Sequence, residues 1–108
     1  MRLLKTDDFS SVFSLRRTAG DAWFQVLVAP NNLPCARLGL VVGRKTDKRA
    51  VRRNYIKRLV RETFRLQAQE LAGLDVVVRA RCSFGRSQGG EARKALRQLF
   101  QRVQRWRA

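Results

Sequence analysis

The chain has 108 residues, of which 24 are Lys or Arg and 8 are Asp or Glu, so its formal net charge is +16. Hydrophobic residues make up 44% of the chain, enough for one core, and we predict a single RNA-binding domain over residues 1–108. So large a positive charge indicates a polyanionic partner, with nucleic acid first and an anionic membrane surface second. The sequence has no histidine, which removes the commonest general base and metal ligand.

The two cysteines and the first residues indicate the compartment. Cys35 and Cys82 lie far apart, without the paired spacing of a zinc site, and we expect free thiols. The start, MRLLKTDDF, lacks the apolar run of a signal peptide, and no segment approaches membrane-spanning length. We therefore predict a cytoplasmic protein without a membrane partner.

The N-terminal part predicts one helix followed by three strands. Thr6-Asp7-Asp8 has the composition of a helix start, and Phe9, Val12 and Phe13 then form one apolar stripe. The strands that we expect after it are Arg16–Ala19 (a short edge strand), Trp23–Ala29 and Arg37–Val42.

The rest of the chain predicts a long basic helix, one strand and a last helix. The basic helix occupies Arg49–Arg65. Gly73 is expected to end the helical segment before the strand Asp75–Ala80. A polar loop, Ser83–Gly90, leads to an amphipathic helix over Glu91–Trp106. The order α-β-β-β-α-β-α predicts an α/β two-layer sandwich with a mixed central sheet, in which the basic helix is a crossover between two central strands.

The basic helix reads RAVRRNYIKRLVRETFR, with seven basic residues and one acid, Glu62. At 100° per residue, six of its polar side chains fall within one arc of roughly 140°. These residues are Arg53, Asn54, Lys57, Arg58, Arg61 and Arg65. The opposite side holds Val51, Tyr55, Ile56, Leu59, Val60 and Thr63, with Arg52 and Phe64 as exceptions. We expect the apolar side to face the sheet and the basic arc to face outward.

Like charges follow one another along this arc at i+4 spacing, and each pair costs about 0.2–0.5 kcal/mol. An ordinary solvated face alternates charges instead, and only Glu62 offers such a pairing here, with Arg58. A bound polyanion would reverse the sign of each repulsive term. Asn54 adds donors and an acceptor among the arginines, which favours recognition of a shaped RNA surface.

The segment AVRRNYIKRLVRETFR, preceded by GLVVGRK, resembles the signature R-N-R-x-K-R-x-x-R of the protein subunit of bacterial ribonuclease P. The matching residues are Arg53, Asn54, Lys57, Arg58 and Arg61. Tyr55 stands where the family usually has a second arginine. DDFSSVF is similar to the family's first helix, and RLGLVVGRK is similar to its third strand and the following loop.

The resemblance implies that the basic helix, with Arg44 and Lys45 of the preceding loop, binds the catalytic RNA of ribonuclease P. The protein then helps that RNA to remove 5′ leaders from precursor tRNA. The resemblance also implies an unusual left-handed crossover, although the general rule favours the opposite hand.

A second surface is implied by the same resemblance. It is a cleft between the first helix and one face of the sheet, and it holds the single-stranded leader. The matching positions are Phe9 and Phe13, with Leu27 where the family has an aromatic residue. Strand alternation would place Trp23 on the same face as Leu27, opposite Phe24.

The sequence offers no protein-borne nuclease centre. It has no histidine and no paired carboxylates such as D-x-D, so we predict neither catalytic residues nor a metal site in the protein. The RNA and the Mg²⁺ ions that it holds would perform the cleavage. One alternative stays open at this point, a small ribosomal or assembly RNA-binding protein. A helix-turn-helix DNA reader fails, because the basic helix follows a strand rather than a short helix and turn.

Overall fold

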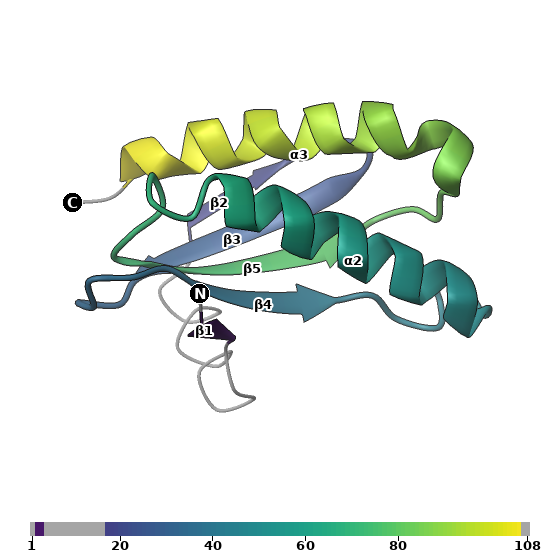
Figure 1. The fold of residues 1–108 in the computed structure, drawn as a ribbon, viewed down its shortest axis with the longest axis horizontal. Helices are drawn as coiled ribbons and strands as arrows, with labels where there is room; N and C mark the ends of the chain where they lie inside the picture. Colours follow the sequence, from purple (N-terminus) through teal and green to yellow (C-terminus); the bar gives the residue numbers. More distant parts are fainter. Residues whose placement is uncertain (1, 4–16, 107–108) are drawn as a thin grey trace.

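The computed structural model describes residues 2–3 and 17–106, in which two helices lie on one face of a five-stranded sheet (Figure 1). The strands are β1 (Arg2–Leu3), β2 (Arg17–Gly20), β3 (Phe24–Pro30), β4 (Arg37–Val41) and β5 (Leu74–Ala80). The helices are α2 (Ala50–Leu66) and α3 (Gly89–Val103), with short 3-10 turns over Arg86–Gln88 and Gln104–Trp106. The predicted first helix, with Phe9 and Phe13, lies outside the described residues.

The sheet has the order β1-β4-β5-β3-β2 and mixes both strand directions. The central strand β5 pairs in parallel with β4 and antiparallel with β3. β2 pairs antiparallel with β3, which confirms the expected edge strand. The two-residue strand β1 pairs in parallel with β4 and was not predicted, because two residues carry no periodic signal. The two-layer sandwich with a mixed sheet is confirmed.

The basic helix α2 connects the neighbouring parallel strands β4 and β5. In Figure 1 both strands run to the right, β5 lies above β4, and α2 lies on the viewer's side of the sheet. The crossover is therefore left-handed, unlike about 98% of such connections. The helix ends at Leu66, well before Gly73, whose φ of 88° serves the turn into β5 instead.

The core lies between the sheet and the helices. Alternate residues of β3 (Phe24, Val26 and Val28) are buried against the helices, as the alternation predicts. Phe64 of α2 and Phe100 of α3 meet in the same core with ring centroids 6.0 Å apart. Because α3 also packs against α2, Phe64 is buried although it falls within the basic arc.

The strand β3 begins at Phe24 rather than at Trp23. The Asp21 Oδ1 atom accepts hydrogen bonds from the backbone N–H groups of Trp23 (2.8 Å) and Phe24 (2.9 Å), which makes a turn before the strand. Strand alternation therefore does not reach Trp23. Its ring packs edge-on against Phe84 on the helix side, with ring centroids 5.4 Å apart. The prediction that Trp23 lies on the cleft face is wrong.

Candidate nucleic-acid interface

The buried side of α2 fixes which side chains point outward. Ile56, Leu59, Val60, Thr63 and Phe64 are buried against the sheet and α3. The arc that the sequence predicts lies on the other side and is accessible along the helix. Asn54, Arg58, Arg61 and Arg65 are exposed, while Arg53 and Lys57 are partly exposed. The structure thus brings all six predicted residues onto one accessible face.

Most of the cations on this face have no partner among the described residues. The side chains of Lys57, Arg58, Arg61 and Arg65 make neither a hydrogen bond nor an ion pair within that part of the chain. Glu62 does not pair with Arg58, and that prediction is wrong. Its Oε2 atom instead lies 3.3 Å from Nη2 of Arg93 on α3, so the pair joins the two helices. Within the described part of the chain, the positive charge of the face is therefore uncompensated.

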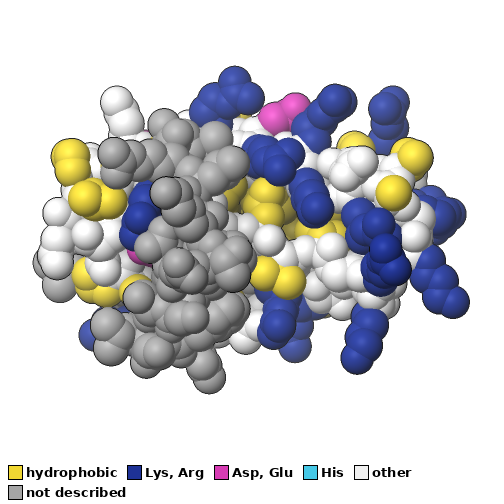
Figure 2. Space-filling model, turned by 90° about the horizontal axis from the view of Figure 1, so that it is seen from below, with side chains coloured by type: hydrophobic (Ala, Val, Ile, Leu, Met, Phe, Trp, Pro, Cys, Tyr) yellow, Lys and Arg dark blue, Asp and Glu magenta, His cyan; other side chains and the backbone are white. Residues whose placement is uncertain are grey.

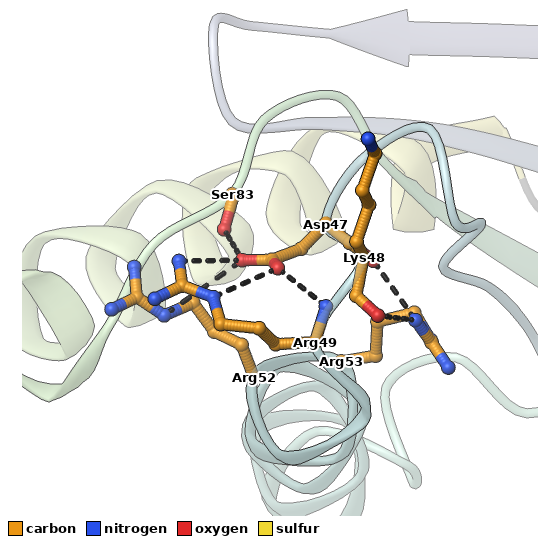
Figure 3. A network of polar contacts seen from close by, with 6 residues as sticks. All are labelled: Asp47, Lys48, Arg49, Arg52, Arg53 and Ser83. Atoms are coloured by element: carbon orange, nitrogen blue, oxygen red, sulfur yellow. Dashed lines mark hydrogen bonds and ion pairs between the residues drawn. The ribbon is translucent and has the colours of Figure 1, made fainter.

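Arg53 plays a different part from its neighbours on the arc. Its Nη1 atom donates hydrogen bonds to the backbone carbonyls of Asp47 (3.0 Å) and Lys48 (2.9 Å), as Figure 3 shows. These bonds tie the loop before α2 to the first turn of the helix. Arg53 therefore supports the loop at least as much as it presents charge.

Asp47 is the centre of a polar network at the start of α2 (Figure 3). Its carboxylate accepts a hydrogen bond from the Arg49 backbone N–H at 2.8 Å and one from the Ser83 hydroxyl. It also accepts hydrogen bonds from the Nε and Nη2 atoms of the Arg49 guanidinium, each at 3.2 Å. The Arg52 Nε atom lies 3.8 Å from the same carboxylate. Sequence reasoning missed Asp47, although it is the one acid between Arg44 and Arg53.

The electrostatic effect of this network has a clear direction. The hydrogen bonds from Arg49 and Ser83 hold the pKa of Asp47 well below its ordinary range, and Asp47 raises the pKa of Arg49. Because the folded-state pKa of Asp47 is depressed, its contribution to stability is present above the unfolded value of about 3.9 and is lost as the pH falls below it. At neutral pH the network is therefore intact.

The loop residues Arg44 and Lys45 are exposed, in agreement with a binding role. Together with Lys48 and Arg53 they line a hollow of about 510 Å³ beside the start of α2. All four lining residues are cations, and we call this hollow the cationic pocket. A hollow lined by cations, with no hydrophobic or aromatic residue among them, suits a phosphate group.

Tyr55 and Val51 were both predicted on the apolar, sheet-facing side of α2. Tyr55 is half-buried and packs against the core, with its ring 6.2 Å from that of Phe84, which confirms its predicted side. Val51, by contrast, is 84% exposed, and the prediction that it faces the sheet is wrong. Val51 belongs to the first turn of α2, and the first turns of this helix extend beyond the ends of β4 and β5 (Figure 1).

The face of the sheet away from the helices carries the second predicted surface. Leu27 is buried there with Ala29 and Val77, beside Val41. The register aligns Gln25, Arg79 and Val41 in the next row of this face. Figure 2 shows hydrophobic side chains bordered by Lys and Arg on this side of the molecule. Phe9 and Phe13 lie outside the described residues, so the predicted cleft stays a prediction.

Other predicted features concern the thiols, metals and membranes. Cys35 and Cys82 are both free thiols, as expected. Within residues 2–3 and 17–106, no group of three or more His, Cys, Asp or Glu is placed to hold a metal ion. Neither α2 nor α3 is long and apolar enough to cross a membrane.

Comparison with known proteins identifies relatives of the whole chain. The family model described as Ribonuclease P matches residues 1–104. The ribonuclease P protein component of Chromobacterium violaceum is 62% identical over 107 residues, covering 99% of this chain and 88% of that protein. The corresponding protein of Azoarcus is 43% identical over 102 residues, covering 94% of this chain and 85% of that protein.

Solved structures agree with these relatives. The ribonuclease P protein of Thermotoga maritima superimposes with a TM-score of 0.71 at 30% identity, covering 95% of this chain and 94% of the other. That of Staphylococcus aureus superimposes with a TM-score of 0.79 at 25% identity, covering 94% of each chain.

Proposed function

Because this chain belongs to the ribonuclease P protein family and is the protein subunit of that endoribonuclease complex, we propose that the outward face of α2 and the loop before it hold the RNA subunit. The residues that we assign to this contact are Arg53, Asn54, Lys57, Arg58, Arg61 and Arg65, with Arg44 and Lys45 of the loop. The family also sets aside the alternative of a ribosomal or assembly protein.

The observation that carries this proposal is the uncompensated charge of α2. Lys57, Arg58, Arg61 and Arg65 are accessible and have no partner among the described residues. Like charges at i+4 spacing destabilise the free helix by about 0.2–0.5 kcal/mol a pair, so the free protein gains nothing from this arrangement. Phosphate groups bound along the face would turn these repulsions into attractions and release condensed counterions.

We assign the chemical step to the RNA and to Mg²⁺ held mainly by that RNA. Mg²⁺ is usually held by one or two carboxylates together with phosphate oxygens and water, and among the described residues no group of three or more His, Cys, Asp or Glu would form a cage of protein ligands. The buried carboxylates of Asp47 and Asp75 are engaged by Arg49 and Arg37, respectively. The protein therefore contributes binding and positioning.

We assign the contact with the substrate to the face of the sheet away from the helices. Precursor tRNA would place its single-stranded 5′ leader there, with Phe9, Phe13 and Leu27 as the matching positions and Arg79 as an accessible cation. Trp23 is left out, since its ring packs on the helix side. We expect this assembly to work in the cytoplasm.

A pair of triple variants tests the RNA face. The first replaces Lys57, Arg58 and Arg61 on α2 with alanine, and the matched control replaces Lys94, Arg97 and Arg102 on α3. Each removes one lysine and two arginines, so their net charges are equal. Binding of the RNA subunit is titrated at several salt concentrations, and thermal melts report folding.

The α2 variant should lose at least about tenfold in RNA affinity, and the slope of log K against log salt should fall by roughly three, one for each phosphate contact. Its stability should stay the same or rise slightly, because repulsive pairs are removed. The α3 control should change little, since distant charges are screened over about 8 Å in physiological salt. Equal losses in both variants would show that overall charge, and not the α2 face, sets the affinity.

A further inference from the structure

A second hollow lies on α2 close to the cationic pocket and differs from it in chemistry. It measures about 450 Å³ and lies between the N-terminal half of α2 and the connection from β5 to α3. Its cations are Arg49, Arg52, Arg58 and Arg86, and its other walls include Val51 and Tyr55. We call it the mixed pocket, because charged and apolar side chains line it together.

The walls of the mixed pocket are held by neighbouring residues. The Arg52 Nε atom lies 3.8 Å from the Asp47 carboxylate, and its guanidinium packs against Gly85, where an added Cβ would stand 3.5 Å from Arg52 Cζ. The Tyr55 ring packs against Phe84. These contacts fix one cation and one aromatic ring of the pocket before any ligand arrives, which lowers the entropy cost of binding.

Val51 indicates whether a bare phosphate or a nucleobase fits the mixed pocket. It is 84% exposed among arginines, and Leu66 is the other large hydrophobic residue so exposed in the described part of the chain. A bare phosphate gains nothing from a valine or a tyrosine ring. A nucleobase gains from both, and arginine planes stack on bases while also holding phosphates. No hydrophobic or aromatic residue is among the four that line the cationic pocket.

From these contacts we propose that the mixed pocket binds one unstacked nucleotide of the RNA subunit. Its base lies against Val51 and Tyr55, and its flanking phosphates contact Arg58 and Arg86. The volume of the pocket lies in the range of small-molecule sites, about 300–1,000 Å³. This inference rests on the proposed function, since it assigns a base contact next to the proposed phosphate contacts of α2.

The test compares Val51→Ser with Leu66→Ser, which also puts a serine in place of an exposed large hydrophobic residue of α2. The wild-type RNA subunit is titrated with each protein at several salt concentrations, and thermal melts confirm that both variants fold. Val51→Ser should weaken binding about three- to tenfold at every salt concentration, because it removes an apolar contact and no charge. Leu66→Ser should bind like the parent. Arg86→Gln should instead lower the salt slope by roughly one.

Dimethyl sulfate modification of the bound RNA gives an independent reading. The parent protein and Leu66→Ser should each protect the base in the mixed pocket from modification. With Val51→Ser the same base should stay reactive. If Val51→Ser binds and protects like the parent while the α2 triple variant loses affinity, the mixed pocket is overturned and the RNA face stands. If neither variant loses affinity, the proposed RNA face itself is wrong.

Discussion

At the scale of single residues, Tyr55 shows how α2 accommodates a departure from the family signature. The resemblance places an arginine there, yet the tyrosine ring packs against Phe84 and its hydroxyl lies over Gly89 at the start of α3. A Cβ atom on Gly89 would stand 2.1 Å from the Tyr55 Oη atom, so the two residues depend on each other. Tyr55 therefore connects α2 to α3.

This contact predicts a rescue between two substitutions. Gly89→Ala should destabilise the protein by about 1–3 kcal/mol, because the added methyl group overlaps the tyrosine hydroxyl. Tyr55→Phe removes that oxygen and leaves Cζ at 3.4 Å as the nearest atom, so the double variant should recover most of the loss. Urea unfolding of the two single variants and the double variant measures the coupling.

Gly90→Ala is the matched control, since an added Cβ there meets nothing within 4 Å. It should be neutral or stabilising by up to about 1 kcal/mol, given the helix preference of alanine over glycine. The proposed contact would be ruled out by equal behaviour of the Gly89 and Gly90 variants.

At the scale of elements, the two faces of the sheet separate the two proposed RNA contacts. The helices cover one face, and on the other face the register places Arg79 of β5 beside Gln25 of β3. If the leader binds there, Arg79→Ala should lower the affinity of the reconstituted holoenzyme for precursor tRNA about fivefold, the equivalent of about 1 kcal/mol. Affinity for mature tRNA, which lacks the leader, should stay unchanged in the same equilibrium titrations.

Arg17→Ala is the control for this substitution. Arg17 is also exposed, but it pairs across from Val28 and so belongs to the helix side of the sheet. The Arg17→Ala variant removes the same charge, and its affinity for precursor tRNA and for mature tRNA should stay unchanged. A parallel loss for both tRNA forms with Arg79→Ala would exclude a leader contact at this face.

The elements also show what the sequence could predict. Hydrophobic periodicity records which side of a segment is buried, so it located the basic face of α2 and the alternation within β3. It carries no information on where a neighbouring element ends. Val51 is exposed because α2 extends beyond the strands, and Phe64 is buried because α3 packs against it.

Side-chain networks were less predictable for a related reason. Glu62 has a possible partner at i−4 in its own helix, but it pairs with Arg93 because α3 is packed alongside. Asp47 receives a hydrogen bond from Ser83, which is 36 residues away in sequence. Such contacts depend on tertiary packing, which a local pattern does not contain.

At the scale of the whole molecule, the net charge of +16 is the dominant feature. The repulsion that it creates opposes the compact state, and it is strongest where cations share one hollow. The cationic pocket is lined by Arg44, Lys45, Lys48 and Arg53. Of these four side chains, only that of Arg53 makes hydrogen bonds to backbone carbonyls of the described residues. An anion that binds there would stabilise the native state selectively, because the unfolded chain has no such hollow.

We therefore expect sulfate to raise the Tm of the free protein more than chloride does at equal ionic strength. Sulfate at 100 times its dissociation constant would add about 2.7 kcal/mol of stability. For a domain of this size, each kcal/mol raises Tm by about 4 °C. Replacing Lys45 and Lys48 with alanine should abolish the difference between the two salts, whereas replacing Lys94 and Arg97 on α3 should preserve it. Circular dichroism melts of the three proteins in both salts measure the effect. Identical melting curves in sulfate and chloride for the parent protein would mean that screening alone relieves the repulsion and that the cationic pocket binds no anion of its own.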